Sequence, residues 1–143
     1  MASKGQLTGM AGVYYAAAEL SKLGFIVTPT SRNAQGIDLL IANSSGTRSY
    51  SAQVKSNATT FGFWLLGEKN LTVSSETLFY IFVNMRKTSI EYYIVPSNVV
   101  ANKIKTSKST SKKTGKLSTW YEFHLTEAKN FQNKWLETFG DPK

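Results

Sequence analysis

The sequence predicts an α/β fold in which helices flank one mixed β-sheet. Three observations lead to this fold class. Apolar residues recur at helical spacing near both ends of the chain, short apolar or alternating stretches lie between them, and turns rich in Gly, Ser and Asn separate those stretches. At 143 residues the chain is long enough to bury a core, so we expect a single domain over residues 1–143.

Helices are predicted at both ends of the chain. The first runs from Leu7 to Gly24, which is placed as C′ glycines are, and the last runs from Thr126 to Gly140. Each helix carries an apolar stripe that should pack against the sheet. The residues of the two stripes are Met10, Val13, Tyr14, Ala17 and Leu20 in the first helix, and Ala128, Phe131, Trp135 and Phe139 in the last.

The strands are predicted from two kinds of pattern. Residues 48–56 alternate apolar and polar side chains, whereas residues 78–85 form a continuous apolar run that is typical of a buried strand. Residues 61–66 fit either a strand or a segment that covers the sheet. The predicted strands are 25–30, 37–43, 48–56, 78–85, 89–96 and 119–125, with a short helix over 96–104.

The balance of charge favours a polyanionic partner. Lysine and arginine number 17 against 9 acidic residues, which gives a formal net charge of +8. A charge of this size promotes association with nucleic acid through phosphate contacts and counterion release. Basic surfaces also keep small proteins soluble, so the charge alone leaves that alternative open.

A lysine-rich segment carries much of this charge. No acidic residue lies between Tyr92 and Tyr121, and Ser and Thr fill most of the gaps between the lysines. Such a composition cannot pack a core, so we expect a flexible loop over residues 105–118. This loop is either an arm that contacts a nucleic-acid backbone or a solvated linker. The lysines expected to bind nucleic acid are Lys103, Lys105, Lys108, Lys112, Lys113 and Lys116.

Composition also argues against several classes of protein. The chain has no cysteine, which removes disulfide frameworks and thiolate metal sites. No apolar run approaches the roughly 20 residues of a membrane span. His124 is the sole histidine, so a zinc site is not expected. We therefore expect a cytoplasmic protein without a membrane segment.

Asp38, Gln53 and Lys55 form the pattern that carries chemistry. They lie on two predicted strands that turn near Ser45, so that Asp38 falls opposite Gln53, and strand alternation gives Gln53 and Lys55 one face. A hard cation such as Mg²⁺ or Mn²⁺ takes oxygen ligands of the kind that Asp38, Gln53 and the Val54 backbone carbonyl supply. Lys55 could then orient an attacking water or neutralise charge on a phosphate. A structural ion pair between Asp38 and Lys55 is the alternative.

These residues resemble the motifs of the PD-(D/E)XK nuclease superfamily. Residues 36–40 (GIDLL) resemble its Asp motif and residues 53–55 (QVK) its (D/E/Q)-x-K motif, while residues 7–27 resemble the first helix and strand of archaeal Holliday-junction resolvases. The resemblance implies a restriction-endonuclease-like fold with an αβββαβ core. It further implies a Mg²⁺- or Mn²⁺-dependent DNA endonuclease with Asp38, Gln53 and Lys55 as catalytic residues, acting as a homodimer or a higher homo-oligomer.

Two positions depart from the pattern of the superfamily. Gln53 stands where many members have Glu or Asp, so it offers an oxygen ligand without a charge. Val13 stands where resolvase-like members carry a glutamate. Glu19 is the only acid in the first helix, so it is the possible helix-1 acid, although helical spacing turns it away from the apolar stripe. Arg32, in the connector before Asp38, is either a phosphate contact or a surface arginine.

The leading functional hypothesis is a metal-dependent DNA endonuclease. The alternative is a non-catalytic DNA-binding or assembly module on a decayed nuclease fold, because Asp38 is the one carboxylate of the motif. A protein-interaction domain whose charge is incidental is a third hypothesis. DNA cleavage separates the first hypothesis from the second, and DNA binding at low salt separates both from the third.

Overall fold

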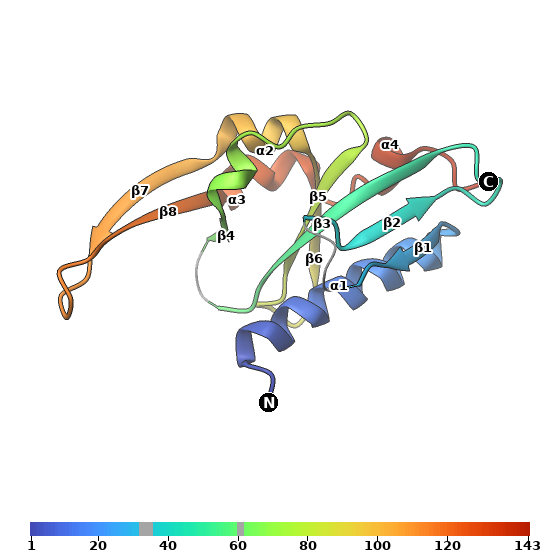
Figure 1. Ribbon diagram of the computed structural model, residues 1–143. Coiled ribbons are helices and arrows are strands. Elements are labelled where there is room, and N and C mark those ends of the chain that lie inside the picture. The colour runs from blue at the N-terminus through green and yellow to red at the C-terminus, as the bar shows by residue number, and fades with distance from the viewer. Residues whose placement is uncertain (32–35, 60–61) are drawn as a thin grey trace.

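Two β-sheets organise the described residues, which are 1–31, 36–59 and 62–143 of the computed structural model (Figure 1). The larger sheet has the strand order β1-β2-β3-β5-β6 and the smaller has the order β4-β8-β7. The strands are β1 (Ile26–Pro29), β2 (Leu39–Ala42), β3 (Ser49–Asn57), β4 (Phe63–Leu66), β5 (Leu78–Asn84), β6 (Glu91–Pro96), β7 (Lys105–Thr110) and β8 (Leu117–His124). The α-helices are α1 (Lys4–Leu23), α2 (Ser97–Lys103), α3 (Leu125–Ala128) and α4 (Trp135–Phe139), and the 3₁₀ turns are η1 (Glu68–Leu71) and η2 (Lys129–Phe131).

The larger sheet is mixed, as predicted. Antiparallel pairing joins β1 to β2, β2 to β3 and β5 to β6, whereas β3 and β5 are parallel. The expected α/β class, with a mixed central sheet flanked by helices, is therefore confirmed. Between β3 and β5, where the αβββαβ order places a helix, the described chain forms β4 and η1, and β4 joins the second sheet.

Local sequence signals fix both ends of α1. Ser3 and Gln6 form a capping box, in which the Ser3 hydroxyl accepts from the Gln6 backbone and the Gln6 side chain accepts from the Ser3 backbone. Gly24 ends the helix with φ of 107°, in the left-handed region that favours glycine. The helix thus starts at Lys4, one turn before the predicted start at Leu7.

No helix in the described part of the chain is long and apolar enough to cross a membrane.

Helix α1 approaches β3 very closely at Gly12. A Cβ placed on Gly12 would lie 1.7 Å from the Ser56 hydroxyl oxygen, so only glycine allows this approach. The buried face of α1 is centred on Val13, Ala16 and Leu20, which rotates it from the predicted stripe and leaves Tyr14 61% exposed. This packing brings the first turns of α1 beside the end of β3 that carries Lys55.

The larger sheet separates two hydrophobic clusters. On one face, α1 and α4 pack against Val54, Ile81 and Ile94. On the other face, β4, β8 and α2 cover Tyr80 and Phe82 of β5. In this second cluster the rings of Phe82 and Phe123 stack with centroids 4.8 Å apart.

The C-terminal helix predicted over Thr126 to Gly140 is broken into α3, η2 and α4. Asn133 has φ of 56°, which an α-helix does not accommodate, and Gln132 forms a β-bridge with Tyr93 of β6. Helical spacing of the apolar residues continues across the break, so the periodicity alone predicted one helix. Trp135 and Phe139 are buried as expected.

The segment expected as a loop over residues 105–118 instead contains β7 and the start of β8. Six register pairs, from Lys105 with Glu122 to Thr110 with Leu117, join the two strands. In Figure 1 these strands run away from the rest of the protein and turn at residues 111–116. We call β7, β8 and this turn the basic ribbon. Periodicity did not predict a strand over residues 105–118, because Lys, Ser and Thr lack the alternation of apolar and polar residues that marks a half-buried strand.

Candidate active site

Asp38 lies directly before β2 and is held by its backbone from two sides. Its N–H donates to the carbonyl of Ala52 on β3 at 2.8 Å, and its carbonyl accepts from the N–H of Thr30 at 2.9 Å. The Thr30 hydroxyl also donates to the carbonyl of Ile37 at 2.5 Å. These bonds extend the pairing of β1, β2 and β3 past the end of β2, and they fix the Cα position of Asp38.

The Asp38 carboxylate caps an open position at the edge of β3. Its Oδ2 accepts from the backbone N–H of Val54 at 2.7 Å. Because the N–H and C=O of one strand residue point toward the same neighbouring strand, the Val54 carbonyl faces the same edge. The Asp38 carboxylate and the Val54 carbonyl therefore face the same strand edge. Asp38 and Lys55 are not among the ion pairs of the described residues, so the structural ion pair that was the alternative does not form.

Gln53 and Lys55 share the face of β3 opposite to Val54. Val54 is buried in the α1 cluster, while Gln53 and Lys55 are half-buried and lie in register with Tyr80 and Phe82 of β5. Burial lowers the pKa of Lys55 from its ordinary value of 10.5, and the negative charge of Asp38 acts in the opposite direction. Lys55 is thus close enough to Asp38 to sense its charge, and it is partly withdrawn from water.

A buried amide holds the side chain of Gln53. Asn70, on η1, donates through Nδ2 to Gln53 Oε1 at 3.0 Å and to the Tyr80 hydroxyl at 2.5 Å. The Asn70 Oδ1 accepts from the Gly67 N–H at 2.8 Å, and the residue is only 7% exposed. Asn70 therefore orients Gln53, and no local signal in the sequence identified it.

Two grooves meet at Lys55. One, of about 820 Å³, runs between β3 and η1 and includes Gly36, Gln53 and Asn70, with Glu68 on its wall. The other, of about 640 Å³, lies between the first turns of α1 and strand β4. Because Lys55 lines both, an extended ligand could pass over the site from one groove into the other.

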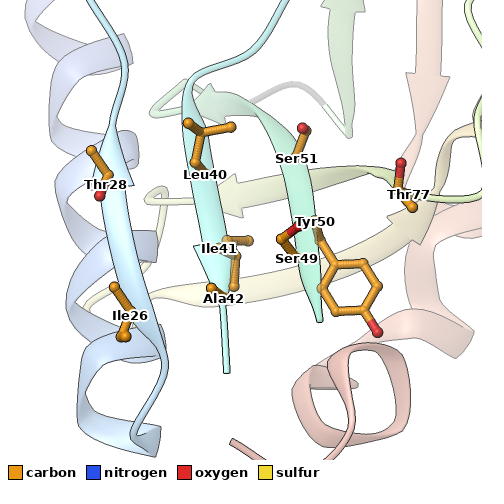
Figure 2. A pocket seen from close by; sticks show the side chains of 9 residues that line it. All are labelled: Ile26, Thr28, Leu40, Ile41, Ala42, Ser49, Tyr50, Ser51 and Thr77. Atoms are coloured by element: carbon orange, nitrogen blue, oxygen red, sulfur yellow. The ribbon is translucent and has the colours of Figure 1, made fainter. Parts of the chain in front are cut away.

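A third hollow lies over β1, β2 and β3, as Figure 2 shows. Thr28, Leu40 and Ser51 stand beside one another across the three strands there, and Ile26 and Leu40 are about half exposed. None of the residues that line it is acidic or basic. This hollow therefore lacks the charged groups that phosphodiester chemistry needs.

One solved structure has a closely similar arrangement of elements. Hjc from Archaeoglobus fulgidus, a Holliday junction resolvase from an archaeal hyperthermophile, superposes with a TM-score of 0.58 over 93% of this chain and 96% of its own, at 10% sequence identity. The chain shares its overall fold with this protein. The restriction-endonuclease-like fold expected from the sequence is thereby confirmed. No family model and no curated protein sequence matches the chain.

The donor atoms at the candidate site suit a hard cation that takes some of its ligands from a substrate. Within the described residues no group of three or more His, Cys, Asp or Glu side chains gathers around a common point. Mg²⁺ keeps several waters and is commonly held by one or two carboxylates together with substrate phosphates. Asp38 offers one such carboxylate, and the Gln53 amide oxygen and the Val54 carbonyl are further oxygen atoms of the kind that Mg²⁺ binds.

The structure does not bring the other predicted residues to this site. Glu19 lies beside Lys22, at 3.4 Å, and near Tyr92 of β6, a strand that β3 and β5 separate from β2. Arg32 lies outside the described residues. Lys103 ends α2, and the other predicted lysines lie on the basic ribbon.

Proposed function

We propose that this protein is a divalent-metal-dependent endonuclease that cuts DNA at Asp38, Gln53 and Lys55. The observation that carries the proposal is the hydrogen bond from the Val54 N–H to Asp38 Oδ2. It sets a carboxylate and a backbone carbonyl at one strand edge, next to a half-buried lysine on a basic chain.

Each residue has a distinct role in the proposal. Asp38, Gln53 and the Val54 carbonyl hold Mg²⁺ or Mn²⁺, which when bound supplies Lewis acidity to a phosphate and acidifies a bound water. Asn70 keeps the Gln53 amide oriented through its 3.0 Å hydrogen bond. Lys55 contacts the scissile phosphate and offsets the charge that develops there. Its lowered pKa favours the neutral amine, which can take a proton from the attacking water and then carries that positive charge beside the phosphate.

DNA contacts and oligomerisation complete the proposal. The ribbon lysines and Lys103 bind phosphates of the DNA, and Arg32, in the connector before Asp38, is a further candidate phosphate contact. A chain with one such site cuts both strands of a duplex, or both strands at a junction, as a homodimer. A four-way junction, the DNA named for Hjc, is one substrate to test.

A second candidate function is a DNA-binding or assembly module without catalysis. It is favoured by the uncharged Gln53 and by the absence of a three-carboxylate cluster among the described residues. This alternative predicts DNA binding that needs no divalent ion and that survives Asp38→Ala.

Cleavage of three DNA forms tests the proposal. Supercoiled plasmid, a four-way junction and single-stranded DNA are incubated with Mg²⁺ or Mn²⁺ and with wild type, Asp38→Ala or Glu137→Gln, an exposed acid on α4 that serves as control. We expect cleavage that Glu137→Gln retains and Asp38→Ala lowers by at least about 100-fold, the loss typical of removing one key electrostatic group. Absence of cleavage that depends on Asp38 would overturn the proposal in favour of the binding module.

A further inference from the structure

The basic ribbon has a shape that burial does not explain. All six residues of β7 are exposed, as are the residues of the turn, and Leu117 and Trp120 on β8 are 58% and 42% exposed. An isolated two-stranded ribbon is only marginally stable in water and gains little from its own packing. The inner end of β8 covers the core through Phe123, but the outer part of the ribbon, residues 107–120, protrudes and therefore calls for a contact outside the chain.

The charge on the ribbon indicates what that contact is. Lysines lie on β7 and in the turn, whereas the one acid is Glu122 on β8, at the base, where it accepts from the Ser107 hydroxyl at 3.2 Å. Ser and Thr fill most of the remaining positions, so the ribbon is narrow and carries many hydroxyl groups. A polyanion complements this surface. The ribbon lysines are Lys105, Lys108, Lys112, Lys113 and Lys116.

The base of the ribbon adjoins the candidate active site. Strand β8 pairs with β4, where Leu65 lies in register with Glu122. Strand β4 in turn forms one wall of the groove of about 640 Å³ that ends at Lys55. A nucleic acid that lies in this groove would therefore meet the ribbon on leaving it.

We propose that the basic ribbon enters the major groove of B-form duplex DNA that lies beside the active site. The major groove, roughly 12 Å wide, admits a two-stranded ribbon, and about 17 Å of paired strand reaches across it. Lysines on both faces and at the tip then meet the phosphates of the two DNA strands. The inference rests on the proposed function, because it specifies the form of the DNA that the same protein binds.

The same geometry disfavours duplex RNA and single strands as partners of the ribbon. The major groove of A-form RNA is too deep and narrow for protein elements to enter. Proteins bind single strands largely through exposed aromatic rings that stack on the bases. Trp120 is not free in this way, because its Nε1 donates to the Ser109 hydroxyl at 2.6 Å and holds the indole across the ribbon.

A shortened ribbon tests the inference by binding alone. Replacing residues 107–120 with Asn-Gly, a two-residue hairpin turn, keeps the pairing of β4 with β8 and removes four lysines. Binding to duplex DNA, duplex RNA and single-stranded DNA of one sequence is measured in EDTA, where no cleavage occurs. We expect affinity for duplex DNA to fall at least about tenfold more than for the other two, and the log–log salt slope to fall by about 3 to 4. Equal losses for all three nucleic acids, or no loss, would overturn the inference.

A wild-type experiment removes any dependence on the folding of the variant. In a duplex whose cytosines carry 5-hydroxymethyl groups with attached glucose, the sugars fill the major groove. We expect this duplex to bind at least about tenfold more weakly than the unmodified one, whereas a minor-groove ligand such as netropsin leaves binding unchanged. Unchanged binding to the glucosylated duplex would exclude entry into the major groove. Both outcomes are independent of cleavage, so a failed nuclease assay does not decide them.

Discussion

The candidate active site and the basic ribbon are adjacent regions with opposite physical character. Asp38, Gln53 and Lys55 are half-buried, and hydrogen bonds from Val54 and Asn70 fix the two acceptors. The ribbon lysines are exposed and form no ion pair with any described residue. Bond cleavage needs a few groups in fixed positions, whereas affinity for a polyanion needs many charges that can adapt. Changes at the site should therefore alter rates, and changes on the ribbon should alter binding and its salt dependence.

The largest effect after loss of Asp38 itself should come from Asn70→Ala. Removal of the amide frees the Gln53 side chain and leaves the Tyr80 hydroxyl without its hydrogen bond from Asn70. We expect cleavage to fall by about 10–100-fold, as with other groups that orient metal ligands, while DNA affinity stays the same. Asn102→Ala, at an exposed position on α2, is the matched control. A parallel loss of DNA affinity would show that the two regions are not separable.

Gln53→Glu should strengthen metal binding at the site, because it adds a negative charge to a side chain of nearly the same shape. The Asn70 amide can continue to donate to the new carboxylate, so the geometry is kept. We expect the Mg²⁺ concentration for half-maximal cleavage to fall by about tenfold, because affinity for hard cations rises with the number of charged ligands. An unchanged metal requirement would indicate that residue 53 is not a ligand.

On the ribbon, Lys113→Gln should give a smaller effect that is confined to binding. Loss of one phosphate contact lowers the slope of log affinity against log salt by about 1. Lys134→Gln removes the same charge from the residue directly before α4, where Lys134 pairs with Glu137 at 3.8 Å, and should leave the slope unchanged. Equal slopes for the two variants would mean that the ribbon acts only through the net charge of the protein.

Glu19→Gln should have the smallest effect on function, because Glu19 lies near β6 and away from Asp38. Burial, then Glu19, then Tyr15 raise the pKa of Tyr92 from its ordinary value of 10.0 to about 12. The pKa of Tyr92 is higher in the folded protein than in the unfolded chain. The contribution of Tyr92 to folding stability is therefore fully present below pH 10 and is lost as the pH rises toward about 12.

The substitution should lower the pKa of Tyr92, so that stability is lost at a lower pH, while cleavage is unchanged. Ultraviolet titration and alkaline unfolding measure the shift. A fall in cleavage with Glu19→Gln would place Glu19 in the site after all.

Local patterns in the sequence predicted the part of the fold that carries the site. The glycine at position 24, the alternation in 48–56 and the turn near Ser45 predicted α1, β2 and β3 to within a few residues, and they set Asp38 opposite Gln53, next to its backbone partner Ala52. Asn70 could not be predicted, because its partners Gln53 and Tyr80 lie 17 and 10 residues away and meet it only in the folded chain.

Two further features depended on single residues or on pairing rather than on periodicity. The break between α3 and α4 is set by the backbone conformation of Asn133, which the apolar spacing does not reveal. The ribbon forms through pairing of β7 with β8, although β7 has no buried side chain that could mark it as a strand.

Binding of Mn²⁺ tests the central claim most directly, because it asks about Asp38 without requiring the right substrate. Electron paramagnetic resonance counts the Mn²⁺ bound by wild type, Asp38→Asn and Glu137→Gln in the presence of a short DNA that supplies phosphate ligands. The account predicts one Mn²⁺ per chain for wild type and Glu137→Gln, and loss of that ion in Asp38→Asn. Equal Mn²⁺ binding by all three proteins, or none by wild type, would contradict it.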